Sequence, residues 1–369
     1  MTWILITREK ANVEIAFIWL ALPALIALIT TPPFASRMEL TSQRSKAFWS
    51  LILRVMGLIF MALLLGGVSQ HYSIEVIVAM ALMIGFVSVL DSVIHAPVPF
   101  LLANQLQINL VRFRVSLMLL IRGANVVTPT VALLFLMNIE IAVYYLIVAG
   151  FLSLASFGVM FVMAEHHAGP ASRDATTAKR NIVLIYSVLL FFLNAVFGHV
   201  TAIMLAYHAR AGHEFAYFNF SFFSGFLVAS IALFVTPSLL SAASKSMNAT
   251  MGGIALSLTV IGLSFGAVIL TGDVWGTVPI AIAGITYGVN LHLVTTILPT
   301  FLGLGGLYKN LNYGKIGATI GGLISGAWVA LITTAHTNLD QAFMMLAIGA
   351  FVLAAMIMGV KILHFRQSD

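Results

Sequence analysis

The chain has 369 residues, of which 61% are hydrophobic and only 8% are charged, and its mean hydropathy is +1.05. A soluble domain of this size could not bury so much apolar surface, so lipid is the expected solvent for most of the chain. The net charge of +6 could suggest a nucleic-acid partner, but the basic residues are spread singly over many connections and form no patch. The absence of Cys excludes disulfides, thiol chemistry and Cys-based metal sites.

Between its charged residues the chain contains about eleven apolar stretches of roughly 19 to 26 residues, each long enough to cross a bilayer as a helix. Continuous apolar runs favour helices over the short alternating segments of a transmembrane barrel. The predicted fold class is therefore an all-α polytopic membrane protein. In chain order the predicted spans are Val13–Thr31, Phe48–Ser69, Ile74–Ala96, Val115–Met137, Ile141–Ala164, Ile182–Tyr207, Ala216–Leu239, Met251–Thr271, Thr277–Leu298, Ile316–Ala335 and Ala342–Leu363.

The basic residues gather on alternate connections between these spans. The positive-inside rule places those connections and the C-terminus in the cytoplasm, and therefore predicts a multi-pass protein of the cytoplasmic membrane. The opposite connections carry mostly acidic residues. The basic residues on the predicted cytoplasmic side are Arg37, Arg44, Lys46, Arg112, Arg114, Arg173, Lys179, Arg180, Lys245, Lys309, Lys315, Lys361 and Arg366.

The longest polar connection, Glu165–Asn181, contains a Gly-Pro pair and mixed charges, which is typical of a linker. It divides the chain into an N-terminal helical bundle (residues 1–164), a cytoplasmic linker (165–181) and a C-terminal bundle (182–369). Five spans precede the linker and six follow it, although two-bundle transporters have equal halves. The apolar opening MTWILIT is too short to span, so we expect a first helix of twelve to be missing or truncated. The alternative is an eleven-helix protein with an external N-terminus.

Two stretches carry a family resemblance: ALPALIALITTPPFASRMELTSQRSKAFWSLILRVMGLIFMALLLGG and IGFVSVLDSVIHAPVPFLLANQLQINLVRFRVSLMLLIRGANVVTPTVALLF. The sequence resembles the major facilitator superfamily, and within it the bacterial effluxers that include enterobactin-type siderophore exporters. The resemblance implies two helical bundles that transport a small organic molecule. It also implies a monomer that needs no cofactor, and it places the first predicted span on the family's second helix.

The family motifs are only partly present. The family's cytoplasmic loop between helices two and three corresponds to Pro32–Arg37, where Arg37 is kept and is assigned a gating role, but Ser36 replaces the acidic residue. The antiporter signature of the fifth helix corresponds to Thr128–Ala132, where Pro129 is kept and the glycines are not. Export is therefore implied by the overall resemblance and not by this signature.

The proton-coupling candidates are Asp91, His95 and Arg122. A charged carboxylate inside a membrane costs about 2.5 to 3.5 kcal/mol, so Asp91 needs a partner or a proton. His95 shares its helix face at i+4, and Arg122 lies seven residues into the next span from the same side. We expect Asp91 to pair with one of them and its protonation, or that of His95, to drive alternating access. The alternatives are a static buried pair and direct substrate contact, whereas Arg54 is expected to extend to the cytoplasmic interface.

Several polar residues fall on the spans that correspond to the cavity-lining helices of the family. A cation at Arg122 would suit an anionic substrate such as a carboxylate or catecholate. The other candidates offer hydrogen bonds, and the alternative for each is a bond to a neighbouring helix. His292 is expected to face a neighbouring helix. The predicted substrate-binding residues are Arg122, Asn194, His199, Tyr287 and Asn290.

Three further features have simpler explanations. The adjacent pair His166 and His167 has no further ligand at a usual spacing, so no metal site is predicted. The aromatic run from Phe215 to Phe226 is assigned to interfacial anchoring, with stacking on an aromatic substrate as the alternative. Close helix packing that lets the two bundles rock is expected at Gly317, Gly321, Gly322 and Gly326.

The sequence therefore predicts a secondary active transporter, and specifically proton-coupled export of a siderophore or drug-like compound. Small-molecule substrate, protons and the bilayer are the expected partners, and no nucleic acid is expected. An importer and a lysophospholipid flippase of the same fold remain alternatives, as does a non-transporting sensor. An enzyme is not expected, because no catalytic cluster or nucleotide-binding motif is visible.

Overall fold

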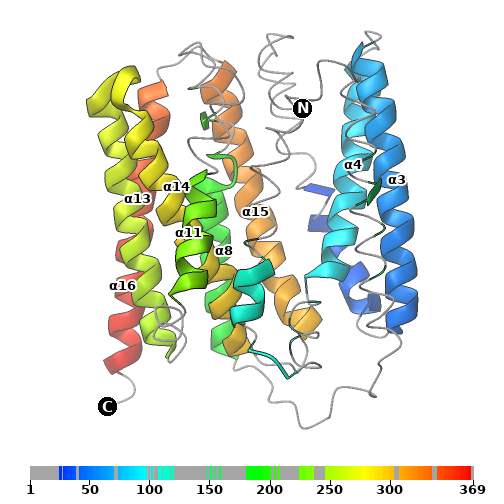
Figure 1. Cartoon of the computed structure of the whole chain (residues 1–369), viewed down its shortest axis with the longest axis horizontal. Helices are drawn as coiled ribbons and strands as arrows, with labels where there is room; N and C mark the ends of the chain where they lie inside the picture. Colours follow the sequence, from blue (N-terminus) through cyan, green and yellow to red (C-terminus); the bar gives the residue numbers. More distant parts are fainter. Residues whose placement is uncertain are drawn as a thin grey trace.

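The computed structural model describes residues 25–26, 28–38, 41–69, 74–96, 107–109, 111–117, 180–200, 224–236, 246–302, 307–334 and 339–366, together with isolated positions between them. All regular structure in these ranges is helical. Figure 1 shows α3 and α4 side by side on one side of the molecule, with α13 and α16 on the far side and the remaining helices between them. The described helices are α3 (Gln43–Ser69), α4 (Ile74–His95), α8 (Arg180–Phe197), α11 (Ser224–Val235), α13 (Met247–Trp275), α14 (Thr277–His292), α15 (Leu307–Thr334) and α16 (Leu339–Arg366).

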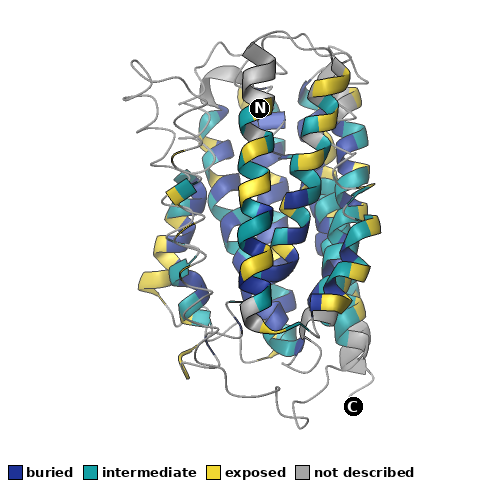
Figure 2. Cartoon of the chain, turned by 90° about the vertical axis from the view of Figure 1, so that its right-hand side faces the viewer, coloured by how far each residue is buried: buried dark blue, intermediate teal, exposed yellow. Residues whose placement is uncertain are grey.

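Four of the described segments are long and apolar enough to cross a membrane: Val78–His95, Met247–Thr271, Thr277–Leu302 and Leu339–Lys361. Their outward side chains support that environment, because large apolar residues such as Leu270 (88% exposed) and Leu256 (68% exposed) project from the bundle. Figure 2 shows the same pattern, with exposed residues on the outer sides of helices and buried residues on the sides that face other helices. Such a surface is stable in lipid and unfavourable in water.

The helices after residue 180 pack as one group. α8 and α15 run parallel, with Phe191 next to Gly321 and the indole of Trp328 donating to the Ala195 carbonyl at 2.9 Å. α13 packs antiparallel on α16, since Gly252 lies near Lys361 and Gly262 near Phe351. α13 also contacts α14, and α11 packs on α14. A large apolar core that includes Phe197, Phe265 and Phe343 joins these helices.

The α3–α4 pair forms a smaller unit. The two helices are antiparallel, since Ser50 and Gly57 of α3 lie opposite His95 and Val87 of α4. A separate apolar cluster fills their interface: Met38, Ala47, Leu53, Val87, Leu90 and Ile94. The C-terminal end of α4 and the N-terminal ends of α8 and α15 lie at the same end of the molecule, which we call the basic end and which the sequence predicts to be cytoplasmic (Figure 1).

One span departs from a regular helix. After α14 the chain continues as a π-helical turn, η2 (Leu293–Ile297), and then as a 3₁₀ turn, η3 (Leu298–Leu302). Pro299 has no backbone N–H and therefore cannot donate the helical hydrogen bond at its position. Departures of this kind inside helices are frequent at functional sites. The predicted span Thr277–Leu298 is correct in position but does not anticipate this change.

Candidate proton-coupling site

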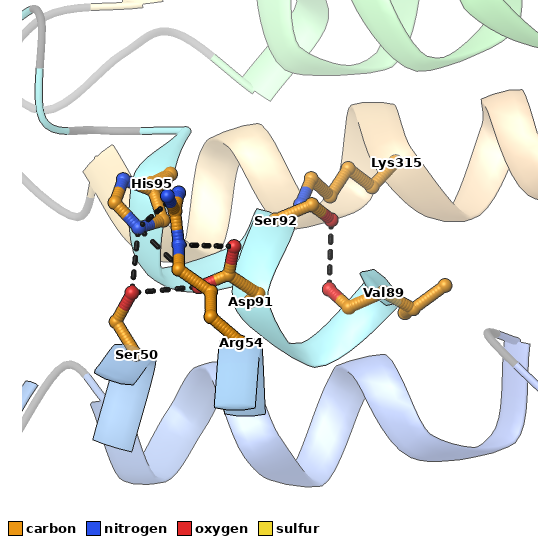
Figure 3. Close-up of polar contacts among 7 residues, drawn as sticks. All are labelled: Ser50, Arg54, Val89, Asp91, Ser92, His95 and Lys315. Atoms are coloured by element: carbon orange, nitrogen blue, oxygen red, sulfur yellow. Dashed lines mark hydrogen bonds and ion pairs between the residues drawn. The ribbon is translucent and has the colours of Figure 1, made fainter. Parts of the chain in front are cut away.

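A cluster of four polar side chains lies between α3 and α4 near the basic end. Ser50 and Arg54 are one helical turn apart on α3, and Asp91 and His95 are one turn apart on α4, so that two helices each present a pair on the facing side. We call these four residues the Asp91 cluster (Figure 3). The side chains of Arg54, Asp91 and His95 are only 23%, 18% and 22% exposed, respectively.

Asp91 is the centre of the cluster. Its Oδ2 accepts a hydrogen bond from Arg54 Nε at 3.1 Å, and its Oδ1 accepts one from Ser50 Oγ at 2.7 Å. His95 Nε2 lies 3.3 Å from the same Oδ1. Both carboxylate oxygens therefore have partners, and the Arg54 guanidinium neutralises the charge. Such pairing removes most of the cost of holding a carboxylate in this environment.

The contacts of His95 depend on its protonation. Arg54 Nη2 lies 3.0 Å from His95 Nε2, and a guanidinium can only donate, so this hydrogen bond requires Nε2 to be unprotonated. A proton on Nε2 would remove that bond and place two positive groups side by side. It would also provide a donor for Asp91 Oδ1 or for Ser50 Oγ, which is 2.7 Å from Nε2. A single proton therefore changes which pairs within the cluster attract each other.

The structure brings together two of the three predicted coupling residues. Asp91 and His95 lie close together, with 3.3 Å between Oδ1 and Nε2, whereas Arg122 lies outside the described residues. Arg54 has a role that the sequence did not predict, because its guanidinium bonds to Asp91. Sequence reasoning also missed Ser50. The i, i+4 spacing could have revealed both residues, because Ser50 and Arg54 are spaced on α3 as Asp91 and His95 are spaced on α4.

The four predicted substrate-binding residues within the described part of the chain make different kinds of contact. Asn194 donates to the Leu190 carbonyl of its own helix at 2.9 Å, and the backbone N–H of His199 donates to Ser325 Oγ at 3.1 Å. The Tyr287 ring is half-buried against Phe197 and Phe226, with ring centroids 5.6 and 5.4 Å away. Asn194, His199 and Tyr287 remain candidates, since each is only partly buried.

Asn290 is placed differently, because it is buried between α14 and α13. Its amide nitrogen donates to Ser257 Oγ at 2.7 Å and approaches the Ile254 carbonyl at 3.4 Å. This geometry favours the helix-packing alternative over substrate contact. His292 also faces a neighbouring helix, as expected, with Nε2 3.1 Å from Ser230 Oγ on α11.

We expect Asn290→Ala to lower the free energy of unfolding by about 1 to 3 kcal/mol, the usual cost of a lost buried hydrogen-bond partner. Thermal unfolding in detergent would measure this loss. Thr286→Ala on the same helix is the control, because the Thr286 hydroxyl is exposed and bonds only to its own helix through the Ile282 carbonyl. An unchanged melting temperature with a raised KM would instead assign Asn290 to the substrate.

The motif residues near the N-terminus are helical. The resemblance places Pro32–Arg37 in a loop, but residues 28–38 form helix and Ser36 Oγ donates to the Pro33 carbonyl at 2.9 Å. The Arg37 side chain is exposed at the end of this helix, so its gating role stays a prediction. Thr128–Ala132, the linker with His166 and His167, and the start of the chain lie outside the described residues. Within the described residues, no group of three metal-binding side chains is present.

The glycine-rich segment of α15 packs closely on α8, as predicted for Gly317 and Gly321. A Cβ on Gly321 would lie 2.1 Å from the Phe191 carbonyl oxygen, and one on Gly317 would lie 2.2 Å from that of Ser187. Gly322 is different, since no atom lies within 4 Å of a Cβ built there. The close contact joins two helices of the C-terminal group. The predicted role of these glycines in rocking between bundles therefore stays untested.

Solved structures that superimpose on nearly the whole chain include several transporters. The chain superimposes on a point variant of the E. coli fucose:proton symporter FucP with a TM-score of 0.58 and 14% identity, covering 96% of this chain and 92% of that one. It matches the nucleoside transporter NupG with a TM-score of 0.55 at 12% identity (97% and 92% covered), and an outward-facing bacterial homologue of the iron transporter ferroportin with 0.56 at 13% (98% and 92%). No protein-family model and no curated protein sequence matches the chain significantly.

These identities are low, so the likeness establishes the fold alone. It covers nearly the whole chain, and FucP is described as a Major Facilitator Superfamily transporter. The narrower resemblance to siderophore exporters receives no support from these matches. The chain therefore has the major facilitator fold, an all-α polytopic membrane architecture.

Proposed function

We propose that this protein is a secondary active transporter that couples proton movement to the export of a small organic molecule across the cytoplasmic membrane. The Asp91 cluster is the observation that carries the proposal. It joins a carboxylate, an imidazole and a guanidinium within hydrogen-bond distance between two helices of the bundle. Ionisable groups within membrane-spanning helices are costly and mark proton and substrate pathways in membrane proteins.

The cluster can accept a proton in two steps that alter its contacts. With Asp91 charged and His95 neutral, Arg54 bridges both residues and holds α3 against α4. Protonation of Asp91 removes the charge that attracts Arg54, and protonation of His95 removes the acceptor for Arg54 Nη2. Each event weakens the α3–α4 contact at this level. A proton taken up on one side of the membrane could then bias the conformation from which it is released on the other.

The proposed substrates are siderophores and drug-like compounds, as the resemblance to bacterial effluxers implies. An anionic siderophore would suit Arg122, and the partly buried Asn194, His199 and Tyr287 would offer hydrogen bonds. Import is the second candidate, because the fold is shared with a fucose:proton symporter as well as with other transporters. The predicted location is the inner membrane, with a cytoplasmic C-terminus and a monomeric state.

Direction and coupling can be tested together in inside-out vesicles with an acidic interior. If the protein exports, labelled siderophores or fluorescent dyes should accumulate inside these vesicles, and a protonophore should abolish the accumulation. Vesicles without the protein provide the baseline. Accumulation only in right-side-out vesicles would indicate import, and accumulation unaffected by the protonophore would contradict proton coupling.

A further inference from the structure

The Ser50 hydroxyl is turned away from its own helix. Serines inside helices commonly bond to a carbonyl of the preceding turn, as Ser92 and Ser264 do here at 2.7 and 2.8 Å. Ser50 is only 3% exposed, and its Oγ instead points across to α4, where it lies 2.7 Å from Asp91 Oδ1 and 2.7 Å from His95 Nε2. Figure 3 shows the Ser50 oxygen with dashed contacts to both residues. The hydroxyl therefore joins two titratable groups of the neighbouring helix.

Asp91 Oδ1, Ser50 Oγ and His95 Nε2 form a triangle with unequal sides. The two sides that meet at Oγ are 2.7 Å long, whereas the direct side between Oδ1 and Nε2 is 3.3 Å long. N–H···O hydrogen bonds in proteins usually lie between about 2.7 and 3.2 Å, so the direct side is longer than an ordinary hydrogen bond. The path of short contacts between the imidazole and the carboxylate therefore runs through the hydroxyl.

This triangle has one hydrogen fewer than its contacts need. A charged Asp91 carboxylate only accepts, and the neutral His95 Nε2 accepts from Arg54 Nη2 at 3.0 Å. The Ser50 hydroxyl has a single hydrogen, which it donates to Oδ1 or to Nε2 and not to both. The other 2.7 Å contact then joins two acceptors. One further proton turns that contact into a hydrogen bond, so the three atoms together are suited to take up one proton.

We infer that Ser50 relays a proton between His95 and Asp91. When His95 carries the extra proton, its Nε2 donates that proton to Ser50 Oγ, while the hydroxyl hydrogen of Ser50 passes to Asp91 Oδ1. One N–H bond and one O–H bond break and two O–H bonds form. The hydroxyl is regenerated, and the net change is one proton moved from the imidazolium to the carboxylate. The inference rests on the proposed function and adds to it the route by which a proton reaches or leaves Asp91.

The position of the relay along α4 gives this route a direction. His95 is the last residue of α4 and lies at the basic end, whereas Asp91 lies one turn further into the span Val78–His95, about 6 Å along the helix axis. The transfer is reversible. Proton-driven export requires that a proton held by Asp91 leaves toward the cytoplasm, and the predicted cytoplasmic side is the basic end. In that direction Ser50 receives the proton from Asp91 and passes it to His95.

The charges around the relay keep the extra proton from remaining on His95. Arg54 Nη2 is 3.0 Å from His95 Nε2, so an imidazolium there meets a guanidinium at contact distance, whereas a proton on Asp91 creates no such pair of cations. The neighbouring elements carry two further cations in the described part of the chain. Lys46 is buried one turn earlier on α3, and Lys315 of α15 donates to the residue that follows Asp91. His95 is therefore a passing station for the proton.

The relay can be followed without a substrate by infrared difference spectroscopy of the full-length protein in lipid vesicles. A caged proton released by a flash starts the reaction, and the carbonyl stretch of protonated Asp91 reports the arrival of the proton. Asp91→Asn identifies that band. We expect Ser50→Ala to slow the rise of the band at least about 100-fold, the lower end of what a positioned proton-transfer group contributes. Ser50→Thr, which keeps a hydroxyl, should restore the rate.

Ser230→Ala is the matched control. Ser230 is 1% exposed and its Oγ lies 3.1 Å from His292 Nε2, so this variant also removes the hydroxyl of a buried serine beside a histidine. That hydroxyl donates to the Phe226 carbonyl at 3.0 Å and not to a carboxylate, so the Asp91 band should rise at the native rate. His95→Gln should slow the band as Ser50→Ala does. The double variant should be no slower, since both changes interrupt one path.

An unchanged rate in Ser50→Ala would overturn the relay, and so would an equal slowing in Ser50→Thr or in Ser230→Ala. Effects of Ser50→Ala and His95→Gln that multiply would overturn it as well, because the two residues would then act on separate paths. The result is separable from the proposed function. A rise that depends on Ser50 without proton-driven accumulation of substrate would leave the relay standing and remove the transport proposal. Proton-driven accumulation with a rise that does not depend on Ser50 would do the reverse.

Discussion

Asp91→Asn should abolish proton-driven accumulation of substrate while leaving the protein folded and inserted in the membrane. Asparagine has nearly the shape of a protonated aspartate, and its side-chain oxygen can still accept from Ser50 or Arg54. It cannot exchange a proton or carry the charge that balances Arg54. The variant should therefore bind substrate and allow energy-independent exchange, but it should not convert a proton gradient into a substrate gradient.

We expect no measurable proton-driven accumulation in a vesicle flux assay of Asp91→Asn. Coupling requires the group that carries the proton, and substrate binding that remains in the variant cannot replace that group. Asp340→Asn is the matched control. Asp340 lies in the first turn of α16, the last helix of the chain. Its charge there contributes at most about 1 kcal/mol through its interaction with the helix dipole. Full proton-driven flux in Asp91→Asn, or an equal loss in Asp340→Asn, would contradict the role of the Asp91 cluster.

Gly321→Ala should be strongly destabilising, although it adds a single methyl group. Its Cβ would lie 2.1 Å from the Phe191 carbonyl oxygen and 2.8 Å from the Ala195 nitrogen, which are backbone atoms and cannot rotate away. α15 and α8 would have to separate, and overpacking of this kind costs about 1 to 3 kcal/mol or more. Because Lys315 is carried by the same helix, the displacement should also weaken its hydrogen bond to Ser92 Oγ on α4, which is 2.7 Å long.

Gly322→Ala provides the matched control one position later on the same helix. No heavy atom lies within 4 Å of a Cβ at Gly322, so the added methyl group meets open space. Thermal unfolding in detergent should show a clear fall in melting temperature for Gly321→Ala and none for Gly322→Ala. Equal melting temperatures for the two variants would show that the close α8–α15 packing does not stabilise the protein.

The sequence predicts the membrane fold well because hydrocarbon imposes a simple rule, a run of apolar residues long enough to span. Helix ends are less well predicted for the same reason. α15 begins at Leu307 although its predicted span begins at Ile316, and α3 begins at Gln43 instead of Phe48. Backbone hydrogen bonding continues through the polar residues that flank a span, and hydropathy does not detect this continuation.

The candidate site could be predicted only in part. Asp91 and His95 are recognisable because they share one helix and their i, i+4 spacing brings them together. Ser50 and Arg54 lie on another helix, and no pattern within a single segment shows which helices face each other. Lys315 is further removed, since one sequence contains no information that joins residue 315 to residue 92. The positive-inside rule therefore explained Lys315 only as a residue that marks the cytoplasmic side, whereas the structure shows it donating a hydrogen bond to Ser92.

The central claim is that protonation of the Asp91 cluster and substrate binding are linked, and a change in the number of bound protons upon substrate addition tests it most directly. In weakly buffered detergent solution, addition of a transported substrate to the native protein should change the pH, because an antiporter exchanges one for the other. The account predicts such a signal for the native protein and for Asp340→Asn, and none for Asp91→Asn. A signal of equal size in Asp91→Asn would contradict the account.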